Sequence, residues 1–107
     1  MQNLKTEIEQ SPALMLYFTS PTCSICYVLQ PKLEELLVQK YPQMALTIVA
    51  AEKRQMETAQ LGVFSFPTVL VFFHGKEFVR LGGSFSLQQL ATQIERPYQM
   101  LFSDPKN

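Results

Sequence analysis

A continuous apolar run from Ala13 to Phe18 (ALMLYF) constrains the fold of this chain more than any other feature. A strand with one face in solvent alternates apolar and polar residues, whereas this run has no polar position. It is therefore expected to be a strand covered on both faces of a sheet. Residues 69–73 (VLVFF) form a second apolar run. Both runs are far too short to cross a bilayer as helices.

The other elements are predicted from the spacing of apolar residues and from helix-ending signals. Helices are expected at 1–10, 24–40, 52–60 and 86–96, and further strands at 44–51 and 77–82. Pro31 should kink the second helix without ending it, because the apolar period resumes beyond it. Gly62 is a good left-handed cap for the third helix. Pro97 should end the last helix near Arg96, since the residue before a proline avoids the α region.

These elements follow one another as helix, strand, helix, strand, helix, strand, strand and helix, with residues 74–76 turning the final hairpin. This order predicts an α/β fold with a central mixed sheet of about four strands flanked by helices. A chain of 107 residues is long enough for one domain and too short for two. We expect a single domain over 1–107, with its core at 13–96 and a polar tail at 103–107.

Charge and composition limit the possible functions. Nine Lys and Arg residues balance nine Asp and Glu residues, so no charge argument points to nucleic acid or to an anionic membrane as a partner. The first residues (MQNLKTE) are polar and lack the apolar core of a secretory signal. A cytoplasmic protein is therefore expected. In that compartment a Cys-x-x-Cys pair is more often catalytic or metal-binding than a structural disulfide.

The chain has two cysteines, Cys23 and Cys26, and they form such a pair between the strand at 13–18 and the helix that begins at Ser24. Two cysteines with this spacing at a helix start can close a small disulfide ring and reopen it. A thiolate at Cys23 is also stabilised by the unpaired N–H groups and the positive end of the helix. Cys26 lies one turn further inward and should be less exposed. The pair is predicted to be a redox site.

Two other interpretations of the pair stay open. A closed zinc site needs about four ligands, and the chain supplies two cysteines and a single histidine, His74, in the hairpin turn. The pair is also compatible with a vestigial or regulatory role in a domain that acts by binding other proteins. Metal analysis tests the first interpretation, and a disulfide-reduction assay tests the second.

From Ala13 to Ile94 the sequence resembles the thioredoxin family, and four features carry the resemblance. The first is the cysteine pair between a buried strand and a helix. Pro31 follows the second cysteine by five residues, like the kink proline of thioredoxin helices. Phe66-Pro67-Thr68 opens the third strand, as the cis-proline motif of the family does. Gly83 lies just past the hairpin, where these proteins keep a glycine near the active site.

The sequence departs from the family pattern at several positions. Thr22 replaces the usual tryptophan before the first cysteine, Ser24-Ile25 replaces the usual Gly-Pro, and Ile48 replaces a lysine on the second strand. Tyr17 stands where the family keeps a buried acidic residue thought to take the proton from the second cysteine. A phenol with a pKa near 10 is a poor proton acceptor at neutral pH. Tyr17 is therefore expected to pack in the core, with its hydroxyl near the inner thiol.

The resemblance implies a thiol–disulfide oxidoreductase in which Cys23 attacks a substrate disulfide and Cys26 resolves the mixed disulfide. It also implies a cis peptide bond before Pro67, which would bring the Phe66 backbone beside Cys23 to pair with an extended substrate segment. The other residues expected to contact substrate are Thr22, Ser24, Ile25 and Gly83. The expected partners are a disulfide-containing protein or small molecule and a reductase or small thiol as electron donor. No metal, organic cofactor, nucleic acid or membrane is expected to take part.

Overall fold

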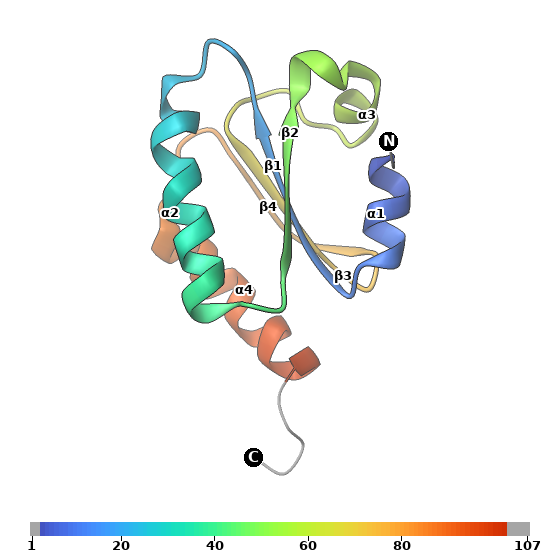
Figure 1. The fold of residues 1–107 in the computed structure, drawn as a ribbon, viewed down its shortest axis with the longest axis vertical. Coiled ribbons are helices and arrows are strands. Elements are labelled where there is room, and N and C mark those ends of the chain that lie inside the picture. The colour runs from blue at the N-terminus through green and yellow to red at the C-terminus, as the bar shows by residue number, and fades with distance from the viewer. Residues whose placement is uncertain (1–2, 103–107) are drawn as a thin grey trace.

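The computed structural model describes residues 3–102, which form a four-stranded mixed sheet with helices on both faces (Figure 1). The elements are α1 (Leu4–Gln10), β1 (Ala13–Thr19), α2 (Ser24–Lys40), β2 (Ala45–Ala50), the short 3-10 helix η1 (Ala51–Lys53), α3 (Gln55–Gln60), β3 (Thr68–Phe73), β4 (Lys76–Gly82) and α4 (Leu87–Phe102). The strand order is β2-β1-β3-β4, with β1 parallel to β2 and antiparallel to β3, and β4 antiparallel to β3. Helices α2 and α4 cover one face of the sheet, and α1 and α3 cover the other. The predicted fold class is confirmed.

The strand β1 is central, and this position explains its unbroken apolar sequence. All residues from Ala13 to Phe18 are buried. Met15 and Tyr17 belong to the core on the α2 and α4 side, whereas Leu14 and Leu16 belong to the core that contains residues of α1. Burying each large apolar side chain contributes about 1.5–3 kcal/mol to the stability of the folded state. The strand therefore holds both layers of helices on the sheet.

The helix α2 continues through Pro31 to Lys40, as predicted. Proline inside a helix removes one backbone hydrogen bond, so the helix needs support from packing. That support comes from its buried face, which contains Cys26, Leu33 and Leu37 and packs against the sheet.

The helix expected at 52–60 is divided into η1 and α3. Arg54 between them has φ of −138° and ψ of 51°, which are not helical values, so the single-helix prediction is wrong at this residue. The predicted cap at Gly62 is confirmed. Its φ is 73°, and its N–H donates to the Ala59 carbonyl at 2.9 Å.

The turn of the hairpin is shorter than the predicted three residues. His74 and Gly75 have positive φ values of 50° and 81°. Two such residues form a turn whose twist matches that of the flanking strands. Lys76 therefore already belongs to β4.

The prediction that the last helix ends before Pro97 is wrong, because α4 continues through it to Phe102. The residues beyond Pro97 pack well enough to offset the lost backbone hydrogen bond. The Tyr98 ring lies 4.9 Å from the Tyr41 ring and 4.6 Å from the Phe102 ring, measured between centroids. The Tyr98 hydroxyl also accepts a hydrogen bond from the Gln43 N–H at 3.0 Å. The contacts with Tyr41 and Gln43 join residues that are distant in sequence, so local sequence patterns do not indicate them.

Buried side chains lie on both sides of the range 13–96 expected for the core. Leu4 and Ile8 of α1 pack on one face of the sheet, and Tyr98 of α4 packs on the other. The expected polar tail at 103–107 lies outside the described residues. Within residues 3–102, no helix combines the length and the apolar character needed to cross a membrane.

Candidate active site

The cysteine pair lies where the chain leaves β1 and enters α2. The Cys23 N–H donates to the Ser20 carbonyl at 3.2 Å and closes the turn after β1. Cys23 is the N-cap residue of α2, and no side chain among the described residues caps this helix start. The first turn, Ser24-Ile25-Cys26, contains no acidic residue. Because the first N–H groups of a helix lack partners and its dipole is positive there, this environment favours a negative charge on the Cys23 sulfur.

The sulfur atoms of Cys23 and Cys26 are joined in a disulfide, and the two Cα atoms are 5.4 Å apart. Cys26 is 2% exposed and faces the sheet, whereas Cys23 is partly exposed. The expected difference in exposure is therefore confirmed. A molecule that approaches from solvent meets the Cys23 sulfur first.

The segment before β3 is held against the end of β4. The peptide bond between Phe66 and Pro67 is cis, the state that the resemblance implies. The Pro67 carbonyl accepts a hydrogen bond from the Gly83 N–H at 2.8 Å, and the Thr68 hydroxyl donates to the Ser65 carbonyl at 2.6 Å. Pro67 is buried, while Phe66 and Gly83 are partly exposed. Two segments far apart in sequence thus meet at one end of the sheet.

The cysteine pair lies at this same end, because the end of β1 adjoins the start of β3. Phe18 pairs with Thr68 in the antiparallel register. Ser20, just before the pair, and Phe66 line one groove of about 370 Å³. Cys23 and Phe66 also pack against the same core cluster. The side chains of Thr22, Ser24 and Ile25 are exposed at the adjacent start of α2.

Tyr17 lies beneath the pair and is completely buried. Its hydroxyl donates a hydrogen bond to the backbone carbonyl of Cys26 at 2.9 Å. Burial raises the pKa of Tyr17 to about 12. The expected core position is confirmed, and the contact with the inner cysteine is made to its backbone. A phenol that keeps its proton in this way does not act as a base at neutral pH.

Replacing Tyr17 with phenylalanine is expected to slow turnover by less than tenfold. The variant keeps the ring and loses one hydrogen bond, and such a bond contributes about 0.5–1.5 kcal/mol to the stability of the folded protein. Because the pKa of Tyr17 is about 12, the wild-type hydroxyl stays protonated between about pH 6 and about pH 9. The pH profiles of kcat/KM for wild type and variant should therefore have the same shape. A larger loss, or a changed profile, would mean that the phenol transfers a proton.

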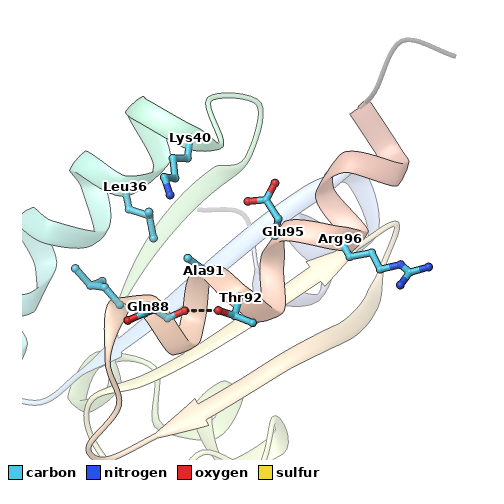
Figure 2. A pocket seen from close by; sticks show the side chains of 8 residues that line it. Leu36, Lys40, Gln88, Ala91, Thr92, Glu95 and Arg96 are labelled. Carbon is cyan, nitrogen blue, oxygen red and sulfur yellow. Dashed lines mark hydrogen bonds between the residues drawn. The ribbon is translucent and has the colours of Figure 1, made fainter. Parts of the chain in front are cut away.

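Another hollow lies between α2 and α4, away from the cysteines (Figure 2). Its volume is about 730 Å³, and its lining includes Lys40 from α2 and Glu95 and Arg96 from α4. The Glu95 carboxylate accepts a hydrogen bond from the Tyr41 hydroxyl at 2.8 Å. In the part of the chain that the structure describes, no three or more His, Cys, Asp or Glu side chains are grouped to hold a metal ion.

A closed Cys-x-x-Cys ring at a helix start, after the central strand of this sheet, defines a thiol–disulfide oxidoreductase. Comparison with known proteins agrees with this class. The family model described as Thioredoxin matches residues 1–96. The chain therefore belongs to the thioredoxin family.

The chain is similar to several curated proteins and solved structures. It is 24% identical to the thioredoxin-like protein YdfQ of Bacillus subtilis over 98 residues, which are 92% of this chain and 87% of that protein. It is 29% identical to a thioredoxin of Haemophilus influenzae over 83 residues, 78% of each chain. The oxidised mitochondrial thioredoxin 3 of Saccharomyces cerevisiae superposes with a TM-score of 0.76 at 22% identity, covering 85% of this chain and 84% of that one. This last likeness shows a shared fold.

Three exposed apolar side chains near the pair were not predicted from the sequence. Tyr27, Val28 and Phe64 are 69%, 62% and 79% exposed. Tyr27 and Val28 directly follow Cys26, whose side chain faces inward. Residues next to an inward-facing position on a helix point away from the core. The expected burial of Cys26 could therefore have predicted that Tyr27 and Val28 are exposed. Phe64 has no comparable signal, because its exposure depends on the path of a loop.

Proposed function

We propose that Cys23 is the attacking thiol and Cys26 the resolving thiol, within a single thioredoxin-like domain. The observation that carries this assignment is the unequal exposure of a bonded pair at a helix start. Cys23 is partly exposed, while Cys26 is 2% exposed. An incoming disulfide has access to the Cys23 sulfur, and Cys26 is held close enough to complete the exchange.

The reaction starts from the reduced protein. The Cys23 thiolate attacks one sulfur of the substrate disulfide, forming a mixed disulfide and releasing the other substrate sulfur as a thiolate. The Cys26 thiol loses its proton to water or to the outgoing thiolate and attacks the Cys23 sulfur. The Cys23–substrate bond breaks, and the second substrate sulfur leaves. The substrate gains two electrons, and the protein ends with the Cys23–Cys26 disulfide found in this structure.

The proposed substrate contacts surround Cys23. The Phe66 backbone pairs with an extended substrate segment as an added strand, which is supported by the position of Phe66 in the groove beside the Cys23 turn. The Gly83 backbone is proposed to contact the substrate as well, which is supported by the hydrogen bond from its N–H to the Pro67 carbonyl. The exposed residues at the start of α2 proposed to contact substrate are Thr22, Ser24 and Ile25.

The proposed substrate is a disulfide in a protein or a small molecule. The protein is returned to its dithiol state by a reductase or a small thiol, and the exchange itself uses no metal or organic cofactor. The proposed location is the cytoplasm, where thiol reductants that can supply the electrons are maintained.

The test is the reduction of an insulin disulfide by dithiothreitol, measured with wild type, with Cys23→Ser and without protein. Wild type is expected to accelerate the reaction, and Cys23→Ser should give the rate of dithiothreitol alone, because the attacking sulfur is missing. Equal rates in all three samples would contradict the proposal. They would favour an interaction module whose cysteines do not catalyse exchange.

A further inference from the structure

Another groove lies between the β3–β4 hairpin and the second half of α4, at the end of the sheet opposite the cysteine pair. Phe73, the last residue of β3, lines this groove, whereas Thr68, the first residue of β3, pairs with Phe18 beside the cysteine site. Five steps along a strand span roughly 17 Å. In Figure 1 the hairpin and the start of α2 lie at opposite ends of the sheet. A molecule in this groove therefore leaves the Cys23 sulfur uncovered.

The walls of the groove are largely apolar. They come from Phe73 and Phe78 of the hairpin and from Pro97, Met100 and Leu101 of α4. Phe78 is 52% exposed and Met100 is 77% exposed, so apolar surface is left in contact with solvent. The volume of the groove is about 610 Å³. Pockets of about 300–1,000 Å³ with apolar and aromatic walls and a few polar groups are typical of sites for small molecules.

A β-bulge in β4 lies at Phe78, which has no partner residue on β3. The residues on either side of it are paired, Glu77 with Phe72 and Val79 with Val71. A bulge bends its strand and changes the direction of a side chain, and bulges are frequent beside functional sites. The Phe78 ring contacts the Phe73 ring edge-on, with the centroids 5.2 Å apart. The irregular edge of the sheet thus presents an aromatic side chain to the groove.

Basic side chains flank these apolar walls. Lys76 of β4, Arg96 of α4 and His74 of the turn line the groove, and none of the described lining residues is acidic. Neither Lys76 nor Arg96 forms an ion pair with another residue in the range 3–102. Figure 2 shows the Arg96 side chain extending away from Lys40 of α2. Two positive charges without an acidic partner therefore border the groove.

The acidic residues next to these two cations in the sequence are bound elsewhere. The Glu77 carboxylate pairs with the Arg80 guanidinium at 2.7 Å. The Glu95 carboxylate accepts a hydrogen bond from the Tyr41 hydroxyl at 2.8 Å. The negative charge that complements the groove is thus left to a bound molecule, and an apolar part of the same molecule gains from burial against the aromatic walls.

We propose that this groove binds a small amphipathic anion, a carboxylate with a single apolar chain such as a free medium-chain fatty acid. The chain packs on Phe78 and Met100, and the carboxylate lies between Lys76 and Arg96, which donate charge-assisted hydrogen bonds to it. A single chain enters a concave groove, whereas the surface of a bilayer does not. The site is separate from the cysteine pair and does not depend on the reaction proposed above.

The first test measures the binding of decanoate and of decylammonium, which has the same chain length and the opposite charge. Both are titrated below their micelle concentrations, and the NMR signal of the Met100 methyl group reports binding in the groove. Wild type is expected to bind decanoate at least about tenfold more tightly, because two exposed cations attract one ligand and repel the other. Acetate, which has no chain, should bind at least about a hundredfold more weakly than decanoate. Equal affinity for the two long-chain ligands, tighter binding of decylammonium, or an unmoved Met100 signal would overturn the inference.

Paired variants separate the groove from the net charge of the protein. Lys76→Gln/Arg96→Gln is expected to lower the ratio of the two affinities by about tenfold. Lys32→Gln/Lys40→Gln removes the same charge from exposed positions of α2 and should keep the wild-type ratio. Phe78→Ser should weaken the binding of both ligands by at least about threefold, because it removes part of the apolar wall. If the two double variants lowered the ratio equally, the ligands would sense only net charge and the groove would not be the site.

Two further measurements exclude other locations and other occupants. Cys23→Ser should bind decanoate as tightly as wild type, and a loss of binding in this variant would place the ligand at the cysteines instead. Phosphatidylglycerol vesicles should leave the protein in the supernatant after sedimentation. If the vesicles carried down wild type but not Lys76→Gln/Arg96→Gln, this surface would contact a membrane, and the proposed ligand class would be wrong.

Discussion

Replacing Cys26 with serine is expected to stop turnover while Cys23 still forms a mixed disulfide with its substrate. The first bond exchange needs only the Cys23 sulfur, which is partly exposed at the start of α2. The second exchange needs a sulfur held beside it, and the pair is close enough to be bonded in this structure. Intramolecular attack by a well-placed group gains an effective concentration far above that of any added thiol. Turnover should therefore fall at least about a hundredfold.

The covalent product is detected as a mass increase equal to one substrate chain, released by dithiothreitol. Cys23→Ser is the matched control and should show no such adduct. If Cys26→Ser turned over at the wild-type rate, resolution would come from an external thiol. If the adduct formed on Cys26 in Cys23→Ser, the two roles would be reversed.

Replacing Tyr98 with alanine is expected to lower the free energy of unfolding by about 3–5 kcal/mol, the usual cost of deleting a buried aromatic ring. Tyr98 is 8% exposed, packs on Tyr41 and Phe102, and accepts a hydrogen bond from the Gln43 N–H. The variant would leave a cavity and an unpaired amide in the region where α4 meets the end of α2. Urea denaturation measures the change through the midpoint at constant slope.

Two control variants separate the ring from its surroundings. Tyr98→Phe should lose only the hydrogen bond to Gln43, about 0.5–1.5 kcal/mol. Gln99→Ala changes the exposed neighbour and should have an effect within about 0.5 kcal/mol. If Tyr98→Ala were as mild as Gln99→Ala, the helix would end before Pro97 in solution, as its local sequence suggests.

The fold could be predicted because its central strand has no polar position. An unbroken apolar run from Ala13 to Phe18 requires cover on both faces, and the order of the remaining elements then leaves few arrangements. The end of α4 could not be predicted in the same way. Sequence rules for helix ends consider only the backbone hydrogen bond that is lost at Pro97. The contacts of Tyr98 with Tyr41 and Gln43, which compensate for that loss, involve residues that are distant in sequence.

Those features of the site that depend on residues close together in the sequence could be predicted. The spacing of Cys23 and Cys26 and their place before a helix are visible in the sequence, and the structure bears out their unequal exposure. The contact from Tyr17 to the Cys26 carbonyl is a tertiary hydrogen bond that no sequence pattern indicates. The exposure of Phe64 also depends on the course of its loop, which is fixed partly by Arg80 from another strand.

The most direct test of this account measures how fast each cysteine of the reduced protein reacts with iodoacetamide as pH is raised. Mass spectrometry of the digested protein assigns the modified residue. Cys23 should be modified first and much faster than Cys26, with a midpoint below about pH 8.5, the value for an ordinary cysteine, because the start of α2 favours its thiolate. Modification of Cys26 at the same rate, or reaction of Cys23 only above that pH, would contradict the account.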